Sequence, residues 1–271
     1  MHNTWAQIHV ASSTKFCCCA IFFAAACWSG AVDAAEIAVA AASDLNFAFK
    51  EAAGVFEQQT GTHVKLSLGS SGNLFSQIQN GAPFDLFFSA DIRYPQKLEE
   101  SGQAVPGSVF RYAVGRIVLW VPNRRGLPSP QQGLRMLLNG AIRKVAIANP
   151  KHAPYGRAAV AALEYAGVYG SVKDKLVLGE NISQAAQFVE SGAADVGLIA
   201  LSLALAPAMQ QAGQYWEIPQ EAHPPIEQGA VVLKNGHNRV SAQAFVSFLQ
   251  GREGQAILRR HGFVLPDALR P

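Results

Sequence analysis

From residue 36 onward, short apolar runs typical of strands alternate with segments in which apolar residues recur at helical spacing. The first run covers 36–42 and is followed by Ser43 and Asp44, after which the apolar positions keep the 3.6-residue period as far as Gly61. Serine and aspartate accept hydrogen bonds from the first N–H groups of a helix, and glycine often follows the last helical residue. The pattern therefore predicts a strand, a helix capped by Ser43 and Asp44, and a stop at Gly61.

This unit of strand and helix recurs without repetition of its sequence. Further strands are predicted at 63–68, 84–88, 112–121, 144–148, 175–178, 196–199 and 228–233. Further helices are predicted from 70 to 81, around 97, near 134–138, from 154 or 155 to 167, over 182–190 and as a pair within 240–260. Alternation of this kind is typical of an α/β fold with mostly parallel strands.

The two long apolar strands at 112–121 and 228–233 enclose a middle block of the chain. We interpret them as the places where the chain leaves one lobe, builds a second and returns. We expect lobe I to comprise 35–113 and 229–271, lobe II to comprise 114–228, and the two to share hinge strands.

The first 34 residues follow a different pattern. The apolar run 16–28 comes after Lys15, is shorter than the roughly 20 residues that span a bilayer, and leads to small residues ending at Ala34 and Ala35. This predicts a signal peptide over 1–34 and export of the protein. A buried N-terminal helix and lipidation of Cys27 are the alternatives. All four cysteines lie before residue 28, so the predicted mature chain has no disulfide.

Composition and motifs exclude several functions. Charged residues make up 15% of the chain, the net charge is +3 and no block of like charges occurs, so nucleic acid is not an expected partner. Asn73 stands where a nucleophile elbow needs its last glycine, and neither a Walker motif nor a dinucleotide-binding glycine motif is present. No two histidines have the spacing that places both on one helical face, which argues against a built-in metal site.

Hydroxyl or small residues recur at the junctions between predicted strands and helices. Four junctions have this character: Ser43, 70–72, 154–156 and 181–183. A helix N-terminus offers N–H donors and partial positive charge, and ligands bind at the carboxyl ends of strands in α/β sheets. Singly, Ser43, Ser71 and Asn181 read as ordinary helix caps. Together they predict an oxyanion site between two lobes.

Five segments carry a resemblance to the molybdate-binding periplasmic components of ABC transporters. They are 40–45 (AAASDL), 69–74 (GSSGNL), 81–91 (GAPFDLFFSAD), 149–156 (NPKHAPYG) and 194–199 (ADVGLI). The resemblance implies a two-lobed periplasmic-binding-protein fold of type II, in which each lobe is a mostly parallel sheet flanked by helices and the ligand lies in the cleft between lobes. It also implies a monomeric, non-enzymatic protein without a cofactor, which delivers molybdate or tungstate to a membrane permease.

The resemblance implies that molybdate is held by the hydroxyls of Ser43, Ser71 and Tyr155 and by the backbone amide of Ile182. Some members of the family carry a ligand tyrosine at the position of Ala200, and others carry it where this chain has Tyr155. Asp44 also departs from members that have a neutral residue after the serine. Because its carboxylate would repel a dianion, we expect it to turn away as a helix cap, with its backbone N–H facing the ligand.

A site made only of donors suits molybdate and tungstate, which carry no proton near neutral pH, whereas protonated phosphate also needs an acceptor. A sulfate, thiosulfate or phosphate binder on the same fold is the first alternative. A secreted serine hydrolase is a remote one. It would use Ser43 or Ser71 as nucleophile, with His63 or His152 as base.

Overall fold

The computed structural model describes residues 35–266 of the 271-residue chain. The predicted signal peptide and the possible lipidation of Cys27 lie outside the described residues. Among the residues that are described, no helix combines the length and apolar character needed to cross a membrane.

The strands of the described chain form two five-stranded sheets. The first has the order β2-β1-β3-β10-β4, with β1 (Glu36–Ala42), β2 (His63–Gly69), β3 (Leu86–Ser89), β4 (Phe110–Gly115) and β10 (Ile226–Val232). The second has the order β7-β6-β8-β5-β9, with β5 (Ile117–Pro122), β6 (Val145–Ala148), β7 (Leu176–Gly179), β8 (Val196–Ala200) and β9 (Gly213–Glu217).

Both sheets are mostly parallel, as the sequence predicts. In the first sheet β1 pairs in parallel with β2 and β3, and only β10 runs against its neighbours β3 and β4. In the second sheet β6 pairs in parallel with β7 and β8, and only β5 runs against its neighbours β8 and β9. The carboxyl ends of the parallel strands in each sheet therefore meet at one edge, where the following helices begin.

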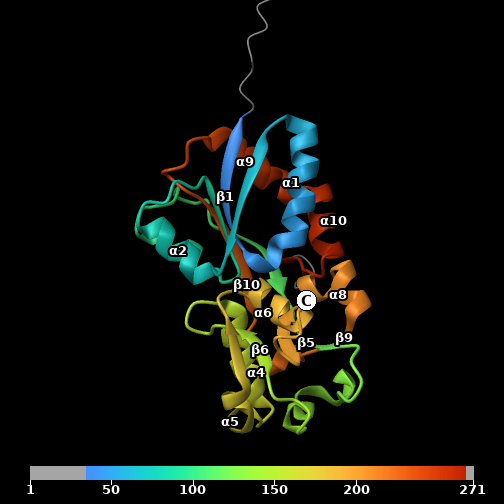
Figure 1. The fold of residues 1–271 in the computed structure, drawn as a ribbon. Helices are drawn as coiled ribbons and strands as arrows, with labels where there is room; N and C mark the ends of the chain where they lie inside the picture. The colour runs from blue at the N-terminus through green and yellow to red at the C-terminus, as the bar shows by residue number, and fades with distance from the viewer. Residues whose placement is uncertain (1–34, 267–271) are drawn as a thin grey trace, which may run out of the picture. The chain divides into compact units, whose positions relative to one another are not determined.

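Helices connect the strands and cover the sheets (Figure 1). The α-helices are α1 (Asn46–Thr60), α2 (Ser71–Gln79), α3 (Arg93–Glu100), α4 (Pro154–Tyr165), α5 (Tyr169–Val172), α6 (Ile182–Glu190), α7 (Leu201–Ala204), α8 (Pro207–Ala212), α9 (Arg239–Gln250) and α10 (Arg252–Arg260). The 3-10 helices are η1 (Ser43–Leu45), η2 (Pro130–Leu138), η3 (Lys173–Lys175) and η4 (Gln220–Ala222). Helices α1, α9 and α10 pack together on the first sheet, and α4 and α6 pack on the second.

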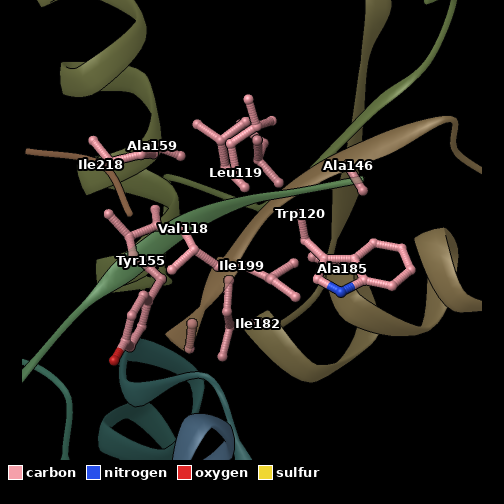
Figure 2. Packing of buried hydrophobic residues seen from close by; sticks show 14 of the residues in the cluster. Val118, Leu119, Trp120, Ala146, Tyr155, Ala159, Ile182, Ala185, Ile199 and Ile218 are labelled. Carbon is pink, nitrogen blue, oxygen red and sulfur yellow. The ribbon is translucent and has the colours of Figure 1, made fainter. Parts of the chain in front are cut away.

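Each sheet has its own apolar core. Beside the first sheet, Phe88 of β3 meets Phe49 of α1 and Phe245 of α9 edge to face, with ring centroids 4.8 and 6.3 Å apart. Beside the second sheet, the buried side chain of Trp120 of β5 packs in a cluster that also holds the ring of Tyr155 (Figure 2). Burial of these large side chains is the main favourable contribution to folding.

The structure corrects the prediction of one strand over 112–121. This stretch forms two strands, β4 and β5, which belong to different sheets and are separated by Arg116. Strand β9 was not predicted either. The chain therefore passes from the first sheet to the second at Arg116 and returns between β9 and β10, over residues 218–225.

Candidate functional site

Residues at the carboxyl ends of strands from both sheets line one small cavity, with an empty volume of about 180 Å³. They come from the segments after β1, β2, β3, β6 and β7, and they are Ala42, Ser43, Asp44, Gly69, Ser70, Ser71, Ala90, Ala153, Pro154, Tyr155 and Ile182. All five residues singled out in the sequence, namely Ser43, Asp44, Ser71, Tyr155 and Ile182, are among them. Neither lysine nor arginine lines this cavity.

Ser71 is the first residue of α2 and is 1% exposed. Its Oγ accepts a hydrogen bond of 2.9 Å from the backbone N–H of Ala90. Within residues 35–266 the Ser71 hydroxyl does not donate a hydrogen bond to any group. Its hydrogen is therefore available to an acceptor in the cavity. The helix cap is the neighbouring Ser70, whose Oγ accepts from the N–H of Asn73, so the reading of Ser71 as a cap is wrong.

Ser43 ties η1 to α6. Its Oγ donates to Oδ1 of Asn181 at 3.2 Å and accepts from the N–H of Ser183 at 3.3 Å, while Ser183 Oγ donates to the Ser43 carbonyl at 2.9 Å. Ser43 makes no capping hydrogen bond to a helix of its own segment. An oxyanion would have to compete with Asn181 for the Ser43 hydrogen.

Ile182 begins α6 behind its cap Asn181, whose side chain accepts from the N–H of Gln184. The first N–H groups of a helix have no partner within the helix. In the described part of the chain, no carbonyl or side chain accepts from the Ile182 amide. This N–H can donate to an anion in the cavity, where the helix dipole also favours negative charge.

Asp44 does not cap a helix, which corrects the prediction from the sequence. Its Oδ2 accepts hydrogen bonds from the hydroxyl of Tyr155 at 3.0 Å and from Nε2 of Gln228 at 2.6 Å. Its Oδ1 is buried and has no hydrogen-bond partner among residues 35–266. The Asp44 carbonyl accepts from the Ser202 hydroxyl at 2.7 Å. The side chain is therefore fixed inside the protein, next to the predicted ligand donors.

Gln228 was missed in the sequence, although it is fully buried in the apolar strand β10. Its Oε1 accepts a 2.6 Å hydrogen bond from Tyr112, which orients its amide nitrogen toward Asp44 and, at 3.2 Å, toward Tyr155. Gly115 leaves room for this cluster, because a Cβ at that position would overlap the Tyr155 hydroxyl. In the sequence, the only sign of its role is that it is a polar residue within a run of apolar strand residues, since a buried polar side chain needs a hydrogen-bond partner.

Burial controls the protonation of this cluster. It raises the pKa of Asp44 from 3.8 to about 6, and the hydrogen bonds from Gln228 and Tyr155 offset only part of that effect. Burial and the charge of Asp44 hold the pKa of Tyr155 well above 10. The Tyr155 hydroxyl therefore keeps its single hydrogen throughout the physiological range.

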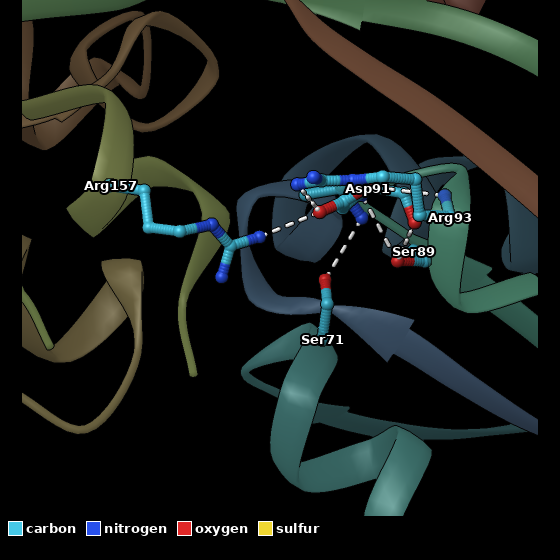
Figure 3. Close-up of polar contacts among 6 residues, drawn as sticks. Ser71, Ser89, Asp91, Arg93 and Arg157 are labelled. Carbon is cyan, nitrogen blue, oxygen red and sulfur yellow. Dashed lines mark hydrogen bonds and ion pairs between the residues drawn. The ribbon is translucent and has the colours of Figure 1, made fainter. Parts of the chain in front are cut away.

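A network of charged residues lies beside the cavity, where Asp91 follows β3 (Figure 3). Oδ2 of Asp91 accepts from Arg93 and from Arg157 of α4, both at 2.6 Å, so an ion pair joins the segments that build the two sheets. Burial acts to raise the pKa of Asp91, but the hydrogen bonds and positive charge of Arg93 and the charge of Arg157 outweigh it and lower the pKa. These groups line a larger cavity, with an empty volume of about 1170 Å³, in which their charges are paired with each other.

The arrangement gives neither predicted nucleophile a base. His152 Nδ1 lies 2.9 Å from Ser70 Oγ rather than from Ser43 or Ser71, and no carboxylate within the described range is bonded to His152. His63 is paired with Glu57 on the surface. The remote hydrolase alternative therefore lacks the required geometry at Ser43 and Ser71.

Two lobes of α/β structure, with buried hydroxyl and amide donors where their strands end, define a solute-binding protein. The family described as bacterial extracellular solute-binding protein matches residues 37–264, and the chain belongs to this family.

Several relatives are known by function or structure. The chain is 42% identical over 235 residues to the molybdate-binding protein ModA of Azotobacter vinelandii, covering 87% of this chain and 92% of the relative. It is 40% identical over 231 residues to ModA of Rhodobacter capsulatus, covering 85% and 89%. The solved periplasmic molybdate-binding protein of Azotobacter vinelandii matches with a TM-score of 0.80 at 38% identity, over 85% of this chain and 99% of that one.

Proposed function

We propose that this protein is the periplasmic binding component of an ABC transporter, which captures molybdate or tungstate and delivers it to a membrane permease. It acts as a monomer, without catalysis or a cofactor. Lobe I, which holds the first sheet, and lobe II, which holds the second, close over the oxyanion about the segments that join them, at Arg116 and over 218–225. The ligand is held by Ser43, Ser71, Tyr155 and the amide of Ile182.

The observation that carries this proposal is that these residues line one cavity, beside the carboxylate of Asp44, in which the donors are hydroxyl and amide groups and no lysine or arginine takes part. A fully deprotonated dianion offers only acceptors, so it is matched by donors alone. Each hydrogen bond to a charged ligand contributes roughly 1.5 to 3 kcal/mol. The two relatives above 39% identity carry molybdate-binding names, which supports the choice of ligand.

Sulfate is the strongest competing ligand, because it is also a dianion without a proton at neutral pH. The sulfate-binding protein SubI of Mycobacterium tuberculosis has a similar structure, with a TM-score of 0.68, but its 18% identity shows only a shared fold. Phosphate retains a proton at neutral pH and requires an acceptor. Size therefore distinguishes molybdate from sulfate, and protonation distinguishes molybdate from phosphate.

Isothermal titration with molybdate, tungstate, sulfate and phosphate at pH 7.5 tests the proposal. We expect molybdate and tungstate to bind at least a hundredfold more tightly than phosphate. Ser71→Ala should weaken molybdate binding by about ten- to a hundredfold, since it removes one donor to a charged ligand. Ser171→Ala, an exposed serine of α5, is the matched control and should leave affinity unchanged. Equal affinity for phosphate and molybdate would contradict the proposal.

A further inference from the structure

The hydrogen atoms around Asp44 can be counted from the contacts. Its Oδ2 accepts one hydrogen from Tyr155 and one from Gln228. The Tyr155 hydroxyl has only one hydrogen, so while Asp44 is ionised this hydrogen is committed to the carboxylate. In that state Tyr155 cannot also donate to an oxyanion.

The second oxygen of Asp44 has no hydrogen-bond partner in the described part of the chain. Asp44 is 1% exposed, yet it lines the same cavity as Ser43, Ser71 and Ile182. An ionised Asp44 would place a buried negative charge beside a dianion, with only neutral donors to compensate. A protonated Oδ1 would instead act as a donor to the oxyanion. The neutral Oδ2 could keep the hydrogen bond from Gln228 and release the Tyr155 hydrogen to the ligand.

The charged groups around Asp44 leave it without a counter-ion. The titratable groups that face it are Tyr155 of α4 and Tyr112 of β4. The charged side chains on the neighbouring elements are either paired elsewhere or exposed. The pairs are Glu51 with His261, Glu57 with His63, Arg157 with Asp91, and Glu227 with Arg111. Lys50 and Glu190 are exposed. Helix α7, which also packs against η1, has no charged side chain.

We propose that the site binds its oxyanion together with one proton, which is taken up by the carboxylate of Asp44. This inference rests on the proposed function. The proton comes from solvent, one O–H bond forms on Asp44, and the net charge of the side chain changes from −1 to zero. Asp44 thereby becomes a hydrogen-bond donor in the site. A neutral side chain such as asparagine at this position could donate without taking up a proton.

The raised pKa of Asp44, about 6, supports this step, because the carboxylate is already easy to protonate near neutral pH. A dianion bound nearby raises the pKa further, since like charge favours the neutral form. Binding should then take up close to one proton per oxyanion at pH 7.5. Where uptake is complete, affinity should fall about tenfold for each unit of rising pH.

The test is titration of the protein with molybdate at pH 7.0, 7.5 and 8.0, in Pipes and in Tris, which differ in ionisation enthalpy. A difference in observed heat between the two buffers gives the number of protons taken up. We expect close to one for the parent protein at pH 7.5 to 8.0. For Asp44→Asn we expect none, with an affinity that does not change over this pH range. Ser71→Ala should bind more weakly and still take up a proton.

Equal heats in the two buffers for the parent protein would overturn the inference, and this result needs no variant. Proton uptake retained in Asp44→Asn would also overturn it. If molybdate does not bind the parent protein at any of these pH values while another oxyanion does, the proposed function itself is wrong. Tight molybdate binding without proton uptake would leave that function intact and reject only the role of Asp44.

Discussion

Replacement of Asp44 by asparagine should stabilise the protein at neutral pH, even without an oxyanion. The variant keeps the shape of the side chain, and its amide oxygen can accept the same hydrogen bonds from Tyr155 and Gln228. It removes the cost of holding a charge in a site that is 1% exposed. The change should therefore act through the charge and not through packing.

The size of the expected change in the free energy of unfolding follows from the raised pKa of Asp44. In the unfolded chain Asp44 titrates near 3.8, and in the folded protein near 6. The folded state therefore holds the proton more tightly, and the stability contributed by the neutral form is present below pH 3.8 and lost as the pH rises through about 6. A shift of about two units corresponds to about 3 kcal/mol above pH 7, and to about 0.5 kcal/mol at pH 4.

Thermal unfolding of the parent protein and Asp44→Asn between pH 4 and pH 8 measures this effect. For a chain of this length 1 kcal/mol changes Tm by roughly 2 to 4 °C, so the gap in Tm should widen by about 5 to 10 °C from pH 4 to pH 8. Any offset from packing is the same at every pH. The widening of the gap is therefore the quantity to measure.

Asp91→Asn is the matched control, because the pKa of Asp91 is lowered by Arg93 and Arg157. The stability it contributes is present above its unfolded value of 3.8 and lost as the pH falls. This variant should be less stable than the parent at pH 7, and the gap should close toward pH 3. A gap for Asp44→Asn that stays constant or narrows with rising pH would refute the reasoning.

Two further predictions concern binding and closure. Tyr155→Phe should weaken molybdate binding by about tenfold or more, because the oxyanion loses the hydroxyl donor that Tyr155 offers once Asp44 is protonated. Tyr165→Phe, at an exposed tyrosine, should bind like the parent, and equal affinities of the two variants in titration calorimetry would count against the role of the Tyr155 hydroxyl. Small-angle scattering should show compaction when molybdate is added, because the lobes can close about the segments that join them, at Arg116 and over 218–225. An unchanged radius of gyration would argue against hinge closure.

The architecture could be predicted because its signals are local. Alternating strands and helices indicate an α/β fold, and helix starts at strand ends indicate where a ligand site forms. The same rule brought Ser43, Ser71, Tyr155 and Ile182 to one cavity, although Ser43 and Ile182 are distant in the sequence. Parallel strands place their carboxyl ends at one edge, so the position of each junction follows from the alternation alone.

The break between β4 and β5 could not be predicted in the same way. Most residues on both sides of Arg116 within 112–121 are buried and apolar, although β4 and β5 belong to different sheets. A pattern of burial does not say which sheet a strand belongs to. Strand β9 was missed because its middle residues are only partly buried at the edge of the second sheet, which weakens the apolar signal.

The misassignment of Asp44 has a different cause, which concerns the chemistry of the site. A serine and an aspartate before a helix are a strong local signal for capping, and that signal considers only the next four residues. The groups that bind the Asp44 carboxylate are instead 111 and 184 residues away in the sequence. The number of hydrogens available to an oxyanion depends on how these distant groups share them. The kind of ligand could therefore be inferred from local patterns, whereas the protonation that accompanies binding requires the folded arrangement of Asp44, Tyr155 and Gln228.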